Sequence, residues 1–160
     1  MILNHFNEKG QAVMVDVSDK QPTLRTAVAC STVRMKPELL AAVMQGQIFK
    51  GDVLAVARLA GITAAKKTPE LIPLAHPLSI HAVSVDFSVD QSSGKIVVEV
   101  SVKAFERSGV EMEAMVAASV AALTIYDMCK GQDRGIGIEE TVLLYKDGGK
   151  SGIYRRGELP

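Results

Sequence analysis

Asp127 and Lys130 are the pair of residues in this sequence best suited to proton transfer. They lie three residues apart near the end of an Ala- and Val-rich segment that is predicted to be helical, so their side chains share one helix face. An opposite charge nearby favours the charged form of each group, which would hold a carboxylate and an ammonium side by side. A surface ion pair at a helix end has the same spacing, so the spacing alone leaves both interpretations open.

The same predicted helix begins with Glu111 and Glu113, where carboxylates are favourable for the helix dipole. Glu113 and Asp127 are 14 residues apart, which corresponds to about 21 Å along the axis and to nearly the same face of a straight helix. We therefore expect that one small ligand cannot contact both residues within a single chain.

A glycine-rich basic loop, residues 146–152, follows the last predicted strand. Its backbone N–H groups and the side chains of Lys146 and Lys150 are suited to binding phosphate. The loop is not a Walker A motif, because Leu144 stands where that motif requires its first glycine. A solvated C-terminal segment would have the same composition, so this interpretation also stays open.

Two further candidates lie in predicted loops. Lys50 precedes a helix N-terminus, which attracts anions, although Asp52 competes for the same backbone donors as the N-cap. His76 lies in a stiff segment between two prolines, and its imidazole can titrate near neutral pH. A hydrogen-bonded structural histidine is the alternative. No cysteine or carboxylate stands at a spacing that would complete a metal site, so we predict none.

The charges indicate what kind of ligand these residues would bind. The 18 Lys and Arg residues balance 18 Asp and Glu residues, which argues against a general nucleic-acid binder, because such proteins depend on a basic surface. Cations gathered at predicted loops and helix ends favour a small polyanion such as a phosphorylated metabolite. Asp127 adds acid–base chemistry that binding alone would not need. A non-catalytic module that senses a nucleotide is the alternative, and it would not depend on Asp127.

The elements that must position these residues combine strands and helices. Their order predicts an α+β fold, a ferredoxin-like two-layer sandwich in which a mainly antiparallel sheet carries helices on one face. At 160 residues, the chain is expected to form one domain, residues 1–160, with a C-terminal tail at 153–160. Strands are predicted at residues 12–17, 26–35, 79–89, 95–105 and 139–146, and helices at 36–46, 52–67 and 110–130.

The sequence also predicts a cytoplasmic protein with no membrane partner. Its longest apolar stretch, Ala114 to Tyr126, is shorter than the roughly 20 residues that span a bilayer. The N-terminus lacks the pattern of a signal peptide. Cys30 and Cys129 stand alone, which is typical of reduced thiols.

Several motifs are specific enough to indicate a family. Through them the sequence resembles the MoaC family, the cyclic pyranopterin monophosphate synthases of molybdenum cofactor (molybdopterin) biosynthesis, over about residues 13–152. The motifs are Met14-Val-Asp-Val-Ser18, Lys50-Gly-Asp-Val53, Ala57-Arg-Leu-Ala-Gly61, Leu71-Ile-Pro-Leu-Ala-His-Pro77, Gly109-Val-Glu-Met-Glu-Ala114, the helix segment 117–130 and Gly148-Gly-Lys-Ser-Gly152.

This resemblance implies a lyase that converts (8S)-3′,8-cyclo-7,8-dihydroguanosine 5′-triphosphate, a cyclised GTP derivative, to cyclic pyranopterin monophosphate with release of diphosphate. It also implies a homohexamer, a trimer of dimers, with active sites between subunits. We expect no required cofactor, although a divalent cation can accompany the triphosphate.

The resemblance assigns roles residue by residue. It implies that Asp127 is the catalytic acid or base and that Lys130 acts beside it. Two departures from the family pattern are Ala75, where the family often has Cys, and Asp147, where it often has Ser. The residues implied to bind the substrate are Lys50, Leu74, Ala75, His76, Met112, Glu113 and Lys146, to which the phosphate-binding interpretation of the terminal loop adds Lys150.

Overall fold

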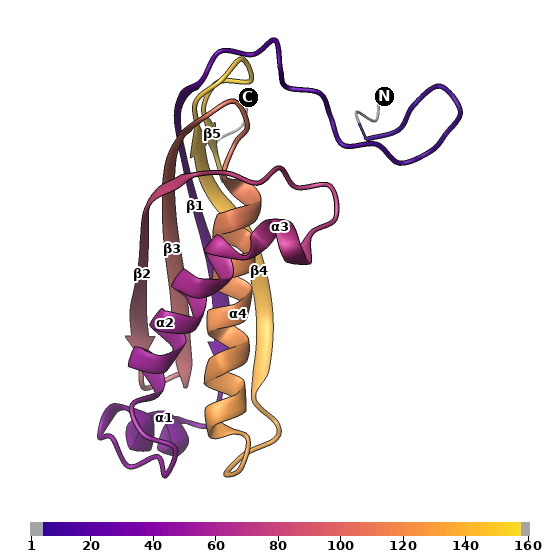
Figure 1. Ribbon diagram of the computed structural model, residues 1–160. Coiled ribbons are helices and arrows are strands. Elements are labelled where there is room, and N and C mark those ends of the chain that lie inside the picture. The colour runs from indigo at the N-terminus through magenta and orange to yellow at the C-terminus, as the bar shows by residue number, and fades with distance from the viewer. Residues whose placement is uncertain (1–4, 158–160) are drawn as a thin grey trace.

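The computed structural model describes residues 5–157 (Figure 1). Residues 1–4, at which no signal peptide is expected, and residues 158–160 of the predicted tail lie outside the described part. The elements are β1 (Thr23–Arg34), α1 (Pro37–Met44), α2 (Val53–Lys66), α3 (Thr68–Leu71), β2 (Ile80–Asp90), β3 (Lys95–Glu106), α4 (Glu111–Cys129), β4 (Gly137–Asp147) and β5 (Tyr154–Arg155).

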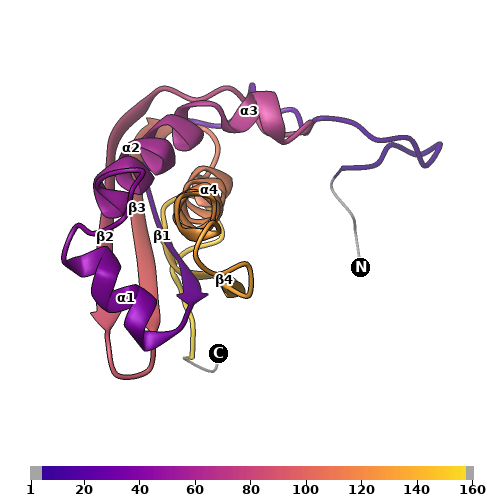
Figure 2. The ribbon, with the colours of Figure 1, turned by 90° about the horizontal axis from the view of Figure 1, so that it is seen from below.

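The five strands form one antiparallel sheet with the order β2-β3-β1-β4-β5. Helix α4 packs over β1, β3 and β4, and α2 packs against α4 and over β2. Both long helices therefore cover the same face of the sheet (Figure 2). The predicted ferredoxin-like α+β sandwich is confirmed.

The core lies between α4 and the central strands. Alternate residues of β3, from Ile96 to Ala104, are fully buried, and so is the alanine-rich face of α4. Small side chains let the two helices approach closely: a Cβ atom at Gly61 of α2 would lie 3.3 Å from the backbone oxygen of Ala117 and 3.4 Å from the Cβ of Ala121. This packing positions both ends of α4, where the candidate residues lie.

Helix α4 is also long and apolar enough, by length and composition, to cross a membrane. More than half of the apolar window that meets this test, 56%, is buried inside the protein. Because these side chains pack against the sheet and α2, their apolar character is accounted for by the core.

The predicted strand at residues 12–17 is wrong. This segment joins no sheet, and Ala12 makes only an isolated bridge with Phe6. Its apolar alternation is nevertheless real, because Val13, Val15 and Val17 are half-buried and the residues between them are exposed. Val15 and Val17 line a cavity instead of packing against a neighbouring strand, and period-2 patterning cannot distinguish these two situations.

Other boundaries depend on local chemistry. Asp52 caps α2 as predicted, accepting a hydrogen bond from the Ala55 N–H at 3.0 Å. Gly46, with φ of +69°, follows α1 as predicted. Gly131 does not take the positive φ of a glycine C-cap, and Lys130 ends α4 instead. The predicted tail includes β5, which pairs with β4.

Candidate active site

The candidate residues form two groups at opposite ends of α4. Lys50, Asp127 and Lys130 meet at its C-terminal end. The residues implied to hold the substrate line a cavity at its N-terminal end, where Met112 and Glu113 lie. Each group contains only part of the chemistry that the sequence predicts for one site.

At the C-terminal end, Asp127 lies between two lysines. Lys130 Nζ donates to Asp127 Oδ1 at 2.6 Å, while Lys50 Nζ donates to Oδ2 at 3.3 Å and to the Asp127 backbone oxygen at 2.8 Å. The hydrogen bond from Lys130, followed by that from Lys50, holds the pKa of Asp127 below its usual range, and Asp127 raises the pKa of Lys130. Near neutral pH a base and an acid therefore lie in contact.

The spacing of three residues predicted the contact between Asp127 and Lys130. It did not predict that the side chain of Lys50 also contacts Asp127. Lys50 is held by the loop between α1 and α2, where the Gly51 N–H donates to the Ile48 oxygen at 2.9 Å and Gly51 has a φ of +100°. Ile48 is buried and anchors this turn. The side chain of Asp127 remains 58% exposed, so a second molecule can reach the cluster.

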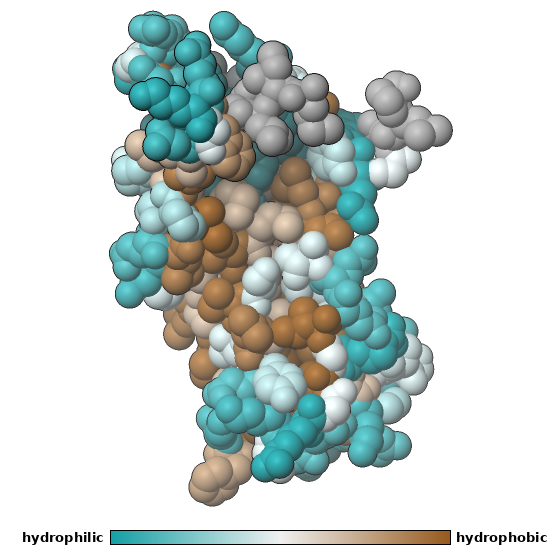
Figure 3. Space-filling view, turned by 90° about the vertical axis from the view of Figure 1, so that its right-hand side faces the viewer, coloured by the Kyte–Doolittle hydropathy of each residue, from teal (hydrophilic) through white to brown (hydrophobic). Residues whose placement is uncertain are grey.

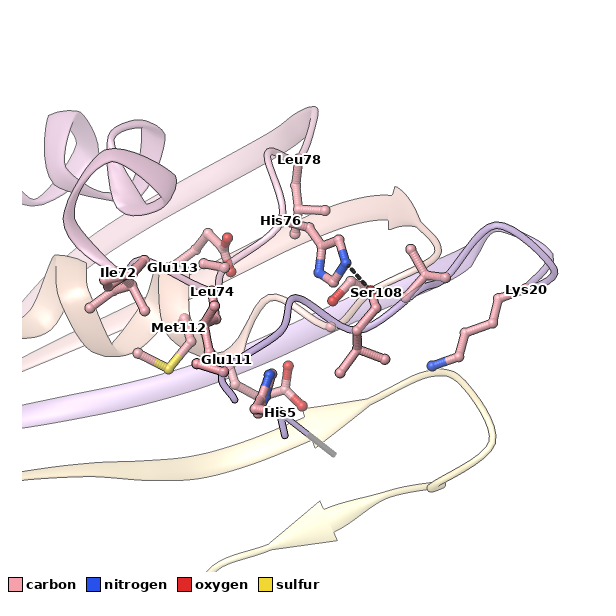
Figure 4. Close-up of a pocket in the computed structure, with 16 residues that line it drawn as sticks. His5, Lys20, Ile72, Leu74, His76, Leu78, Ser108, Glu111, Met112 and Glu113 are labelled. Atoms are coloured by element: carbon pink, nitrogen blue, oxygen red, sulfur yellow. Dashed lines mark hydrogen bonds between the residues drawn. The ribbon is translucent and has the colours of Figure 1, made fainter. Parts of the chain in front are cut away.

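The N-terminal end of α4 forms one wall of a cavity of about 790 Å³ (Figure 4). The segment 72–78 forms another wall, and residues between 5 and 20 form a third. Five of the predicted substrate-binding residues line this one cavity: Leu74, Ala75, His76, Met112 and Glu113.

His76 joins two of these walls. Its Nε2 atom lies 2.7 Å from the backbone oxygen of Val15. A carbonyl oxygen only accepts hydrogen bonds, so Nε2 carries the proton, and in the neutral ring Nδ1 is then an acceptor. The same contact holds the N-terminal segment over the cavity.

Glu113 is the most unusual group in the cavity wall. The residue is only 2% exposed, and its Oε2 atom is buried without a hydrogen-bond partner. Burial, with a smaller contribution from the charge of Glu111, raises the pKa of Glu113 to about 7, although its own backbone N–H opposes the shift. The carboxyl group is therefore close to half protonated at neutral pH.

This raised pKa predicts a pH-dependent stability. Between the ordinary Glu pKa of 4.5 and the folded-state value of about 7, the folded protein binds more protons than the unfolded chain, so the free energy of unfolding falls as pH rises. Between pH 5 and pH 8, we expect the free energy of unfolding of the native protein to fall by about 2 kcal/mol more than that of Glu113→Gln. Denaturant unfolding of both proteins at equal concentration measures the difference, and parallel pH profiles would contradict it.

The terminal loop is only partly available to a phosphate. Lys146 is 17% exposed at its side chain, donates a hydrogen bond to Ser151 Oγ and lies 3.8 Å from Glu111 Oε1. It therefore belongs with the N-terminal end of α4, whereas Lys150 is exposed. The Asp147 carboxylate accepts a hydrogen bond from the Gly148 N–H at 2.7 Å. Asp147, one of the two departures from the family pattern, therefore occupies one of the backbone N–H donors of the loop.

Arg25 is a candidate that the sequence analysis missed. Although it is only 9% exposed, Arg25 donates from Nε to the Glu106 oxygen at 3.1 Å and from Nη2 to the Arg107 oxygen at 3.0 Å. A Cβ atom at Gly149 would overlap its guanidinium group, so the glycine is required for this close approach. The signal available in the sequence was an arginine near the start of a strand, β1, that is otherwise apolar and Thr-rich up to Arg34 at its end.

Comparisons of the sequence with known proteins identify its family. The sequence model of the MoaC family matches residues 14–149. The chain belongs to the MoaC family. It is similar to three proteins that are each named cyclic pyranopterin monophosphate synthase. Those from Pelobacter propionicus and Geotalea uraniireducens are 67% and 66% identical over 158 residues, which is 99% of each chain. The protein from Thermoanaerobacter sp. is 53% identical over 156 residues, which is 98% of this chain and 99% of the relative.

The described part of this MoaC-family protein lacks a cluster of side chains that could bind a resident metal ion. Within residues 5–157, no three His, Cys, Asp or Glu side chains come together as a ligand set. Ala75 lines the cavity and presents no thiol to it. The reactive groups that the site does contain are the carboxylates, lysines and imidazole described above.

Proposed function

We propose that this MoaC-family protein is a cyclic pyranopterin monophosphate synthase, a lyase of molybdenum cofactor biosynthesis. Its substrate is (8S)-3′,8-cyclo-7,8-dihydroguanosine 5′-triphosphate, and its products are cyclic pyranopterin monophosphate and diphosphate. Relatives at 63–67% identity over almost the full chain carry this name. In the structure, the contact of Asp127 with Lys130 and Lys50 is the observation that carries the proposal.

The chemistry matches the groups in the two half-sites. Opening a guanine ring and closing a pterin ring requires several proton transfers, for which the ionised Asp127 is the base and Lys130 the acid. Forming the cyclic phosphate expels diphosphate, whose negative charge the cations of the terminal loop, Lys146 and Lys150, can neutralise. His76 and Glu113 hold the remainder of the substrate in the cavity.

We further propose that each active site combines the two ends of α4 from two subunits. Glu113 and Asp127 are too far apart, at about 21 Å along the helix, to contact one small substrate within one chain. Helix α4 exposes two large apolar side chains, Met112 directly before Glu113 and Leu123 one turn before Asp127, and Leu123 is 55% exposed. Figure 3 shows hydrophobic residues gathered on this side of the molecule.

A two-fold axis beside this surface would place two α4 helices antiparallel and bring the start of one next to the end of the other. Met112, Glu113 and the His76 segment of one subunit would then meet Asp127 and Lys130 of its partner. Three such dimers would form the homohexamer that the family resemblance implies.

The remaining proposals concern location and partners. We place the protein in the cytoplasm without a nucleic-acid or membrane partner. Cys30 and Cys129 are free and buried, and burial raises the pKa of both thiols, as in structural cysteines of reducing compartments. The reaction needs no resident cofactor in this proposal, and any divalent cation would arrive with the triphosphate.

The proposed function is tested by supplying the cyclised substrate and measuring diphosphate and pterin together. We expect equal molar amounts of both products over repeated turnovers. Binding without either product would indicate a nucleotide sensor instead, and diphosphate without pterin would indicate a simple hydrolase.

The terminal loop gives a separate prediction. We expect Lys146→Ala to weaken binding of the triphosphate substrate about tenfold, or about 1.4 kcal/mol, because Lys146 is fixed by Ser151 and Glu111. Lys150→Ala should have an effect below about threefold, because an exposed lysine is screened by solvent. Isothermal titration measures both.

Lys103→Ala, on an exposed position of β3, is the charge-matched control and should leave affinity unchanged. Unchanged affinity in both loop variants would show that the loop does not bind the triphosphate.

A further inference from the structure

Phe49 is the most exposed large apolar side chain in the described part of the chain. Its relative exposure is 102%, so the ring packs against no other part of residues 5–157. The loop that carries it is nevertheless held on both sides, by the buried Ile48 and by the hydrogen bonds of Lys50 to Asp127. A single exposed apolar residue is ordinary on a protein surface, but this one is fixed beside the acid–base cluster.

The bonds of Lys50 determine where this ring lies. Lys50 Nζ donates to the backbone oxygen of Asp127 at 2.8 Å and to its Oδ2 atom at 3.3 Å, and Phe49 is the residue before Lys50. The ring therefore lies at the C-terminal end of α4, as Asp127 and Lys130 do. A molecule that approaches the acid–base cluster also approaches Phe49.

Exposed apolar side chains also lie at the opposite end of α4. Met112 is 41% exposed and lines the cavity, and Leu71, which ends α3, is 57% exposed. Helix α3 contacts α4, and Ile72, the residue after Leu71, lines the same cavity as Met112 (Figure 4). Leu71 and Met112 thus form an apolar rim beside the cavity.

The composite site of the proposed function brings these two surfaces together. When two α4 helices lie antiparallel, the end of one that carries Asp127 lies next to the start of the other. Phe49 then reaches the apolar rim of the partner subunit, and the two-fold axis repeats the contact in reverse. Neither surface is covered within its own chain, so the contact removes apolar area from water on both sides.

We propose that Phe49 is an anchor between subunits, which packs on the apolar rim of the partner subunit. This inference rests on the proposed function for the arrangement of the two subunits. Aromatic residues are enriched at protein interfaces, where a few buried side chains carry most of the free energy of association. By fixing its loop against the partner, Phe49 holds Lys50 and Asp127 at the partner's cavity. It contacts no reacting atom and is therefore a positioning residue.

The first test uses fluorescence and needs no substrate. The chain has no tryptophan, so Phe49→Trp introduces a single reporter at the proposed contact. In protein that sedimentation shows to be assembled, we expect indole emission at the short wavelengths typical of a buried ring and weak quenching by iodide. Long-wavelength emission with full quenching from the assembled protein would overturn the proposal.

A second variant identifies the surface that the ring contacts. Adding Leu71→Ser to Phe49→Trp removes part of the apolar rim, so we expect the emission to move to longer wavelengths. Leu24→Ser is the matched control, because Leu24 on β1 is a leucine of similar exposure, 63% against 57%, and it should leave the emission unchanged. An equal response to the two leucine changes, including no response to either, would overturn the assignment of the rim.

The third test measures assembly and catalysis together. Phe49→Ala should raise the dissociation constant of the dimer at least about tenfold, and Phe49→Leu, which keeps apolar area, should restore most of the loss. Where Phe49→Ala is still assembled, kcat should fall about tenfold with KM within about threefold of the native value, because Lys50 and Asp127 are no longer held in place. A native dissociation constant and kcat for Phe49→Ala would overturn the proposal.

Two further outcomes separate this contact from other roles. Tryptophan emission that moves to short wavelengths only when the cyclised substrate is added would show that the ring at position 49 stacks on the substrate, and would overturn the anchor. Failure of the proposed function appears differently, as a native protein that forms neither diphosphate nor pterin while the emission of Phe49→Trp still reports a buried ring.

Discussion

Replacement of Asp127 by asparagine is expected to lower turnover by at least two orders of magnitude, while substrate affinity changes by less than about threefold. Asparagine keeps the size of the side chain, and its one side-chain oxygen can still accept the hydrogen bond from Lys130, which lies 2.6 Å from Oδ1. Lys50 keeps its 2.8 Å hydrogen bond to the backbone oxygen of residue 127. It cannot take up a proton near neutral pH, and the loss of a positioned base typically costs 10²- to 10⁴-fold in rate.

Single-turnover kinetics with excess enzyme measure this effect without interference from product release. Asp86→Asn, which changes an exposed carboxylate on β2, is the matched control and should retain the native rate. Equal rates for Asp127→Asn and the native protein would show that Asp127 takes no part in proton transfer. A loss of affinity equal to the loss of rate would show that its role is in binding.

The contacts that the sequence predicts are those between residues close along the chain. The spacing of three residues on a helix places Asp127 beside Lys130, and the alternation of residues 95–105 is sufficient to place β3 in the core. The position of Lys50 depends on a turn around Gly51 and on a contact between residues 77 apart. No local pattern contains that information.

Two other features depend on tertiary packing. Residues 12–17 have the apolar alternation of a strand but pack towards the cavity, because no neighbouring strand is available to them. Glu113 looks like an ordinary first-turn carboxylate in the sequence. Its burial in the wall of the cavity that it lines together with the segment 72–78, and hence its raised pKa, follows only from the folded structure.

The division of the candidate site between the two ends of α4 leads to the second large effect. Glu113→Ala and Asp127→Ala proteins are each expected to be inactive alone, because every site then lacks one required group. In a mixed dimer, one site carries both defects, while the other combines the intact Glu113 of one subunit with the intact Asp127 of its partner. Mixing the two inactive proteins should therefore restore activity.

The size of the recovery is fixed by the symmetry. When subunits exchange randomly at equal amounts, half of the dimers are mixed and each mixed dimer has one intact site of two, so up to about a quarter of native activity should return. A mixture of Asp127→Ala and Lys130→Ala proteins is the matched control. Both of these changes lie at the same end of α4, so no arrangement of these subunits restores a site.

The most direct test of the composite site is this recovery, measured as pterin and diphosphate formation after mass spectrometry has shown that the subunits have exchanged. We expect about a quarter of native activity for Glu113→Ala mixed with Asp127→Ala and background activity for the control mixture. Background activity in both mixtures, with complete exchange, would contradict a site shared between two subunits.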